Sequence, residues 1–216
     1  MSEQNDNFFE RSYATGTDLW STVAERDRLL KAWLKFWAKG DHGTLLDIGC
    51  GVARHARIVC PYGWRYVGID KANGCIEQAR ENIREFGAEL VTGDILTARL
   101  GVQFDAVIDF ACFTHLRVDE WKAYQQTLFK HTRPGSRFLL SVWSAESTGA
   151  YGVEFEKDTR EYVVGYHGGV YTRLFTADDM SLFCGDWLIG SVETVTLQQE
   201  PVAGLKHLFV AMRRPG

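Results

Sequence analysis

The stretch that decides the fold is Leu45-Leu46-Asp47-Ile48-Gly49-Cys50-Gly51. Residues 44–48 are short and apolar and end at glycine, which is typical of a buried strand that feeds a tight turn. A helix is expected to follow over about 54–59. Glycines between a strand and a helix let the backbone turn sharply and let a ligand approach the main chain closely. The stretch therefore predicts a ligand-binding loop at the carboxyl end of a parallel strand.

Strands and helices alternate around this loop. Further short apolar strands are predicted over 66–69, 90–92, 106–108 and 138–143. Apolar residues at helical spacing predict helices over 21–39, 73–87 and from Trp121 to the Arg133-Pro134-Gly135 segment. Parallel neighbours need crossover connections long enough to hold a helix. The alternation therefore predicts an α/β fold with helices on both faces of a parallel sheet.

The pattern changes after residue 144. Residues 162–164 and 170–174, joined through His167-Gly168-Gly169, predict a hairpin. The segment 176–179 predicts a capping box for a short helix. Two closing strands, antiparallel to each other, are predicted over 188–196 and 205–212.

Composition limits the class of protein. The chain has 216 residues, of which 45% are hydrophobic and 24% charged, so we expect a single globular domain over 1–216. Its 24 basic and 28 acidic residues give a formal charge of -4, which makes nucleic acid an improbable partner. No apolar run approaches the roughly 18 residues of a membrane span and 1–10 contains no basic residue, so we expect a cytoplasmic protein without a membrane partner. The five cysteines are irregularly spaced, which favours free thiols over a zinc site or a disulfide framework, and no metal is expected.

The glycine loop distinguishes two classes of ligand. A dinucleotide fingerprint needs a third glycine where this chain has Arg54. The carboxylate of Asp47 would also repel a pyrophosphate, whereas it would attract an ammonium group. S-adenosylmethionine carries an ammonium and a sulfonium and has no phosphate, so the loop favours this cofactor.

Acidic residues accompany the carboxyl ends of four successive predicted strands. They are Asp47, Asp70, Asp94 and Asp109. A carboxylate at position 70 can accept hydrogen bonds from both hydroxyls of a ribose that lies over the loop. One or two such residues could be strand-terminal turn residues or helix caps, but a regular series at one sheet edge favours a binding role.

On these motifs the chain resembles a class I S-adenosylmethionine-dependent methyltransferase over nearly its whole length. The family's first motif matches 47–51, with Ala53 where glycine is common. The resemblance implies a three-layer αβα sandwich whose mostly parallel sheet has seven strands, the last one antiparallel. It also implies which residues contact the cofactor. Gly49, Cys50 and Gly51 would contact the methionine part, and Asp70 and Lys71 the ribose. Asp94 and Ile95 would contact the adenine, and Asp109 and Phe110 would lie on the methyl-transfer side.

Two further segments have a functional and a structural interpretation. The N-terminal 1–40 is expected to be a helical lid in which Phe8, Phe9, Tyr13 and Trp20 cover the cofactor, with Tyr13 as a cofactor contact. Residues 144–175 lie where related enzymes place insertions that cover the substrate, and they carry Tyr151, Phe155, Tyr162, Tyr166 and Tyr171. Packing against the body of the protein explains these aromatic residues almost equally well.

His115 is the candidate catalytic residue, because it follows the fourth strand and can take a proton from a substrate. A structural histidine at the start of a helix is at least as good an interpretation. Cys50 has no neighbouring base in its motif, so it is interpreted as a small loop residue and not as a nucleophile.

The predicted function is methyl transfer to a small-molecule acceptor through an O, N or S atom. Proximity and alignment of the acceptor with the activated methyl group supply most of the catalysis, and a base is optional. Two alternatives stay open, a methyltransferase of tRNA or protein and a non-catalytic nucleoside-binding module. The oligomeric state and the acceptor are left open.

Overall fold

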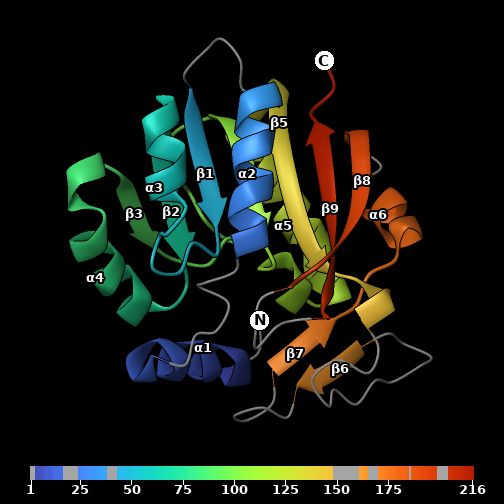
Figure 1. Ribbon diagram of the computed structural model, residues 1–216, viewed down its shortest axis with the longest axis horizontal. Coiled ribbons are helices and arrows are strands. Elements are labelled where there is room, and N and C mark those ends of the chain that lie inside the picture. Colours follow the sequence, from blue (N-terminus) through green and yellow to red (C-terminus); the bar gives the residue numbers. More distant parts are fainter. Residues whose placement is uncertain are drawn as a thin grey trace.

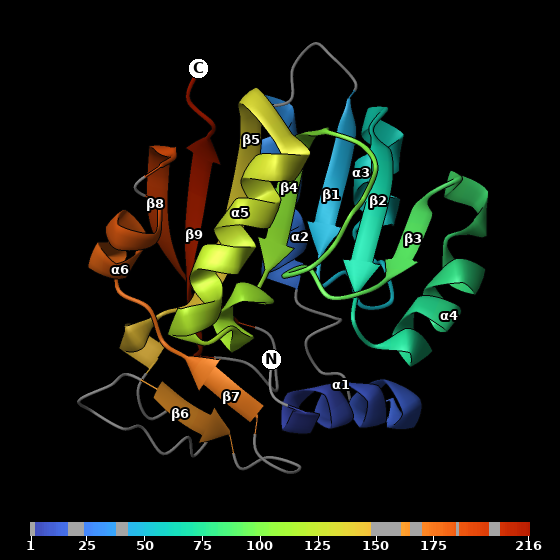
Figure 2. The same ribbon diagram turned by 180° about the vertical axis from the view of Figure 1, so that it is seen from behind.

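A seven-stranded sheet forms the centre of the molecule, in the strand order β3-β2-β1-β4-β5-β9-β8 (Figures 1 and 2). The computed structural model describes residues 3–16, 24–37, 43–147, 161–164, 170–184, 186–198 and 204–216. The strands are β1 Thr44–Ile48, β2 Arg65–Asp70, β3 Glu89–Thr92, β4 Phe104–Phe110, β5 Thr132–Trp143, β8 Leu188–Thr196 and β9 Lys206–Arg213. Strands β1 to β5 are parallel, and β9 lies antiparallel between β5 and β8. The mostly parallel sheet with an antiparallel last strand is therefore confirmed.

Helices cover both faces of this sheet and complete the three layers. One face carries α2 Ala24–Trp37, α3 Ala56–Val59 and α4 Asn73–Asn82, whose apolar side chains pack with Leu45. The other face carries α5 Trp121–His131 and α6 Ala177–Phe183, which pack with Leu46. Adjacent strand residues point to opposite faces, so each strand supplies both cores. By the same alternation, the side chains of Asp47 and Asp109 point to opposite faces of the sheet.

Strand β5 begins earlier than the sequence pattern predicts. It starts at Thr132 instead of position 138, and the Pro134-Gly135 segment lies inside it. Thr132 pairs with Phe104 and Arg137 with Ala106, so the chain bulges between these pairs. Residues 133–135 are exposed and Gly135 has a φ of 87°. A bulge at the exposed start of a strand tolerates a proline that has no N–H to donate, which is why this segment does not end the strand.

The remaining elements lie across the carboxyl ends of the parallel strands (Figures 1 and 2). They are α1 Glu3–Thr15 and a two-stranded sheet of β6 Glu161–Val164 and β7 Val170–Arg173, which confirms the predicted hairpin strands. Its 165–169 connection lies outside the described residues, as do Trp20, Tyr151, Phe155 and Tyr166. The start of α6 shows the predicted capping box. Thr176 Oγ1 accepts a hydrogen bond from the Asp179 N–H at 3.3 Å, and the Thr176 N–H donates to Asp179 Oδ2 at 2.6 Å.

All five cysteines are free thiols, as predicted. Within the described parts of the chain, no helix combines the length and the apolar character needed to cross a bilayer.

Candidate cofactor and acceptor site

The glycine loop after β1 is fastened to β2. The Gly49 and Cys50 N–H groups donate to the Ile69 carbonyl at 2.8 and 3.1 Å. Gly49 and Gly51 have φ values of 66° and 53°, which favour glycine. A Cβ atom on Gly49 would lie 2.6 Å from the Cβ of Cys112, so this close approach also requires glycine. The loop therefore presents bare backbone at the carboxyl edge of the sheet, as predicted.

Asp70 organises this loop from the end of β2. Its Oδ2 accepts from the Gly51 N–H at 2.8 Å and its Oδ1 from the Ala72 N–H at 2.9 Å. Burial raises the pKa of this carboxyl, while the two backbone hydrogen bonds oppose the rise. The structure thus brings the partly exposed side chain of Asp70 against the glycine loop.

The predicted adenine-side residues lie next to Asp70. Lys71 Nζ is 3.5 Å from Asp94 Oδ2, which links the ends of β2 and β3. Asp94 Oδ1 also accepts from the Leu96 N–H at 2.9 Å, and Ile95 is buried in the α5-side core. These residues share one edge with the loop.

Asp47 points into the α2 and α3 side of the sheet. Its Oδ2 accepts from the Tyr66 hydroxyl at 2.5 Å and lies 2.9 Å from His55 Nδ1. Its Oδ1 is buried and has no hydrogen-bond partner among the described residues. A buried carboxylate oxygen without a donor is costly, so this atom is a candidate contact for a cationic ligand group.

Arg26 supplies the complementary group. Its side chain is buried, and its Nε makes no hydrogen bond with any residue that the structure describes. Burial, together with the charge of nearby Arg54, lowers the pKa of this guanidinium to about 10, whereas the nearby Asp109, Asp27 and Tyr13 oppose the fall. The group is still a cation at neutral pH, and it lies within electrostatic reach of the end of β4 and of α1.

These unpartnered atoms test the fit of S-adenosylmethionine. The cofactor has an α-amino acid end and a ribose with two hydroxyls. Arg26 offers a cation for the carboxylate, Asp47 offers an anion for the ammonium, and Asp70 offers acceptors for the hydroxyls. The residues present therefore fit the cofactor. Sequence analysis missed Arg26, although its place four residues before Leu30 on the apolar stripe of α2 was a usable signal.

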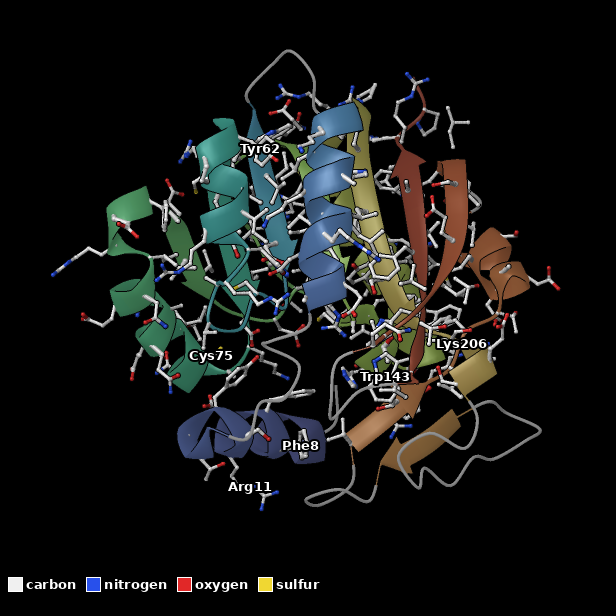
Figure 3. All side chains as sticks on the ribbon, in the orientation of Figure 1. Phe8, Arg11, Tyr62, Cys75, Trp143 and Lys206 are labelled. Atoms are coloured by element: carbon white, nitrogen blue, oxygen red, sulfur yellow. The ribbon has the colours of Figure 1, made fainter. Side chains whose placement is uncertain are left out.

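Helix α1 packs over the loop. A Cβ atom on Gly51 would lie 2.5 Å from the Tyr13 hydroxyl. Glu10 accepts hydrogen bonds from the Asn73 and Gly74 N–H groups at 2.6 and 3.2 Å, and thereby joins α1 to the start of α4. Figure 3 shows Phe8 on α1, below the sheet. Phe8 and Tyr13 are buried, so this helix both packs against the body of the protein and covers the glycine loop.

His115 follows β4, in a turn that Asp109 holds. The Asp109 carboxylate accepts from the Cys112 N–H at 2.8 Å, the Phe113 N–H at 3.1 Å and the Tyr124 hydroxyl at 2.7 Å. Burial raises its pKa to about 7. The side chain of Asp109 therefore serves the fold, on the face opposite to Asp47, while Phe110 packs on the His55 ring at a centroid distance of 4.7 Å.

The tautomer of His115 follows from its partners. Nδ1 lies 3.0 Å from the Tyr171 carbonyl oxygen, and a carbonyl can only accept, so Nδ1 carries the hydrogen and Nε2 the lone pair. Burial, together with the nearby charge of Arg26, lowers the pKa of this imidazole to about 4, while the hydrogen bond with Tyr171 opposes the fall. The Phe9 ring packs at 5.1 Å. Strand β7 and α1 thus hold a neutral histidine that can accept a proton at Nε2.

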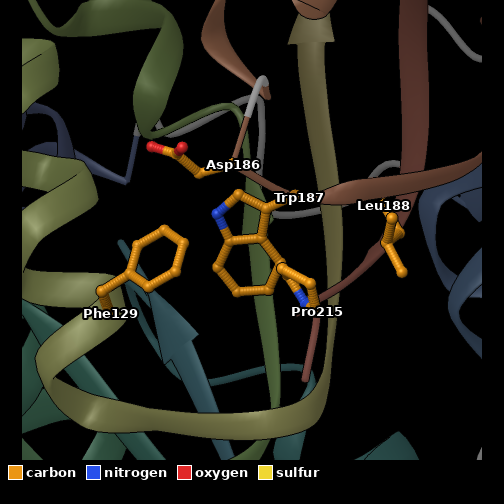
Figure 4. A pocket seen from close by; sticks show the side chains of 5 residues that line it. All are labelled: Phe129, Asp186, Trp187, Leu188 and Pro215. Atoms are coloured by element: carbon orange, nitrogen blue, oxygen red, sulfur yellow. The ribbon is translucent and has the colours of Figure 1, made fainter.

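Neither the thiol of Cys50 nor a distant pocket takes part in the proton chemistry of this site. Burial raises the pKa of the Cys50 thiol well above its usual range, which agrees with its interpretation as a packing residue beside Gly68. A cavity of about 380 Å³ lies at the opposite, amino edge of the sheet and is lined by Phe129, Asp186, Trp187, Leu188 and Pro215 (Figure 4). Among the described residues, no cluster of three or more potential ligands could hold a metal ion.

Comparison with known proteins agrees with the fold. A family model described as a methyltransferase domain matches residues 45–135. The chain is 28% identical over 199 residues to the 2-heptyl-1-hydroxyquinolin-4(1H)-one methyltransferase of Mycobacteroides abscessus, covering 84% of this chain and 82% of the relative. It is 35% identical over 107 residues to the malonyl-[acyl-carrier protein] O-methyltransferase of Serratia marcescens, covering 48% and 39%.

Solved structures show the same architecture. The 1,6-didemethyltoxoflavin-N1-methyltransferase of Burkholderia thailandensis, with S-adenosylhomocysteine bound, has a TM-score of 0.79 at 21% identity over 99% of this chain and 88% of that chain. The N-methyltransferase NodS of Bradyrhizobium japonicum has a TM-score of 0.73 at 16% identity, covering 99% and 100%.

Fold, loop and matches together define a Rossmann-like α/β methyltransferase. The matched methyltransferase domain and the named relatives support S-adenosylmethionine-dependent methyl transfer, with S-adenosylmethionine as the cofactor.

Proposed function

We propose that this methyltransferase methylates an acidic hydroxyl group on a small heteroaromatic molecule. The observation that carries the proposal is the state of His115, a neutral imidazole whose Nε2 is free of the hydrogen and whose pKa is about 4. So weak a base removes protons efficiently only from acidic groups. The hydroxyquinolinone in the name of one relative and the 1,6-didemethyltoxoflavin bound in one similar solved structure support a small heteroaromatic acceptor.

The cofactor supplies a methyl group that is already activated by a positively charged sulfur. The residues of the chain orient it. In this proposal Gly49, Cys50 and Gly51 contact its methionine part between Asp47 and Arg26, and Tyr13 covers it. Asp70 and Lys71 bind the ribose, Asp94 and Ile95 the adenine, and Asp109 and Phe110 support the methyl-transfer side. Alignment and exclusion of water then provide most of the rate acceleration.

The two segments that cross the carboxyl edge have separate roles in this proposal. The lid of 1–40 closes over the cofactor, and the segment 144–175 covers the acceptor. The contact of β7 with His115 supports the second role, because Tyr171 fixes the tautomer of the candidate base. The cytoplasmic location stays a prediction.

Measured methyl transfer from radiolabelled S-adenosylmethionine tests the proposal. We expect transfer to 1-hydroxyquinolin-4(1H)-one and none to benzyl alcohol, whose hydroxyl is not acidic. His115→Gln should lower kcat roughly 10²-fold or more and leave the affinity for S-adenosylhomocysteine unchanged. Equal rates in the variant would remove His115 from the reaction, and faster transfer to the alcohol would contradict the acidic acceptor.

A further inference from the structure

A second buried histidine lies at the carboxyl edge of the sheet, and the mechanism above does not use it. His207, on β9, has a relative exposure of only 1%. Its Nδ1 is 3.0 Å from the Ser141 hydroxyl on β5, and its Nε2 is buried without a hydrogen-bond partner in the described parts of the chain. A buried imidazole nitrogen without a partner is costly, so it marks a place where a ligand atom would be favourable.

The pair with Ser141 decides which nitrogen of His207 carries the hydrogen. Ser141 is fully buried, and His207 Nδ1 is the acceptor that the described residues offer to its hydroxyl. A serine hydroxyl that donates to Nδ1 requires the hydrogen of the imidazole to be on Nε2. Burial also lowers the pKa of this imidazole well below its usual range, and Arg26 lowers it further, so the ring is neutral. Its Nε2 is thus a hydrogen-bond donor for which the described residues provide no acceptor.

Aromatic rings surround this donor on one face of the sheet. Trp143 and Phe209 lie with ring centroids 6.1 and 6.2 Å from that of His207, and Phe110 lies 6.1 Å from Phe209. Figure 3 shows Trp143 at the lower end of the sheet, close to β7. Rings in such a row offer packing surface to another flat ring.

The same residues connect His207 to the candidate base. The Trp143 N–H donates to Thr114 Oγ1 at 3.2 Å, directly before His115 in the chain. Trp143 also pairs with His207 across β5 and β9. Arg26 lies within electrostatic reach of both histidines, and its positive charge favours a ligand oxygen with negative character.

We propose that His207 Nε2 donates a hydrogen bond to a keto or enolate oxygen of the acceptor ring, and so directs the acidic hydroxyl of that ring towards His115. This inference rests on the proposed function and narrows its substrate class to ring systems that carry a second oxygen. His207 is then a specificity-determining residue, and Ser141 a positioning residue that acts through the tautomer of His207.

Two probes with the same skeleton test this. Quinolin-4(1H)-one carries the oxygen and quinoline lacks it. Each probe is titrated into the protein loaded with S-adenosylhomocysteine, and its affinity is measured by isothermal titration calorimetry. His207→Phe keeps a ring but removes the donor. It should weaken binding of quinolin-4(1H)-one about tenfold, which is the effect of one buried hydrogen bond, and change quinoline binding by less than about twofold. Ser141→Ala should show the same selectivity with a smaller loss.

The affinity for S-adenosylhomocysteine is the control for folding and should be unchanged in both variants. Equal weakening of the two probes, unchanged binding of quinolin-4(1H)-one, or a wild type that binds neither probe would overturn the inference. A parallel loss of affinity for S-adenosylhomocysteine would also overturn it, because His207 would then serve the cofactor. Failure of the wild type to bind S-adenosylhomocysteine at all would instead refute the proposed function.

Discussion

Arg26 lies on the apolar stripe of α2, in a position where helical spacing otherwise places Leu30, Trp33 and Leu34. An arginine that remains charged in such a place needs an anionic partner, and within the described residues its Nε has none. We therefore assign its partner to the carboxylate of the cofactor. This residue illustrates how a site appears in the structure as a buried polar atom to which the described residues offer no partner.

Arg26→Gln should weaken binding of S-adenosylhomocysteine by roughly 10- to 100-fold, the effect of a lost charge-assisted hydrogen bond. Binding of 5′-methylthioadenosine, which has no amino acid end, should not change. Isothermal titration of both ligands measures the difference. Arg28→Gln, an exposed position on the same helix, is the control and should leave both affinities as they are. A similar loss for the two ligands would contradict the assignment.

The acid limb of the pH–rate profile reports on His115. Its neutral form is the base, and its pKa is about 4 instead of 6.5. Activity should therefore be constant from neutral pH down to about pH 5 and fall with a midpoint near 4. Circular dichroism at each pH shows whether the protein is still folded. A midpoint near 6.5 in folded protein would show that this imidazole is not held in the buried, neutral state described above.

Ala53 adopts a φ of 55° in the loop, where the family commonly has glycine. A left-handed conformation costs a residue with a Cβ atom about 1 kcal/mol. Ala53→Gly relieves this strain while it removes a buried methyl group, so we expect the free energy of unfolding to change by less than about 0.5 kcal/mol. Ala56→Gly, equally buried but helical, should destabilise by about 1 kcal/mol or more. Urea denaturation measures the free energy of unfolding of both variants. An equal loss of unfolding free energy in the two variants would rule out strain at Ala53.

At the scale of elements, α1 is held by a few polar contacts and not by a large core. Glu10 provides acceptors for two N–H groups at the start of α4. Glu10→Ala should therefore speed amide hydrogen exchange in 3–16 by roughly 5- to 30-fold, which corresponds to about 1–2 kcal/mol. Glu81→Ala, an exposed change of the same charge on α4, is the control. Equal exchange in the two variants would show that Glu10 does not fasten α1.

The elements that the sequence predicts well are those whose signals are local. The strand over 44–48, the glycine turn and the capping box at 176–179 depend on neighbouring residues, and each was found. Strand β5 was predicted too short because its pairing with Phe104 through a bulge is a tertiary feature that overrides the proline signal. The unpartnered atoms of Arg26 and His207 were missed for a related reason, since only packing shows whether a polar group has a partner.

At the scale of the whole molecule, we expect the carboxyl edge of the sheet to bind a nucleoside that carries an ammonium group and no phosphate. The acidic residues at the ends of β1 to β4 and the glycine loop lie on this one edge, which is also where α1 and β7 gather. A dinucleotide or a nucleoside triphosphate would bring phosphates next to Asp47 and Asp70, which is unfavourable because like charges repel.

Calorimetric titration with S-adenosylhomocysteine, NADH and ATP under identical conditions tests this expectation most directly. We expect S-adenosylhomocysteine to bind and the two phosphate-bearing ligands not to compete with it. Asp70→Ala should weaken the binding of S-adenosylhomocysteine by about 1–3 kcal/mol. Tight binding of NADH or ATP, without binding of S-adenosylhomocysteine, would contradict the assignment of the site.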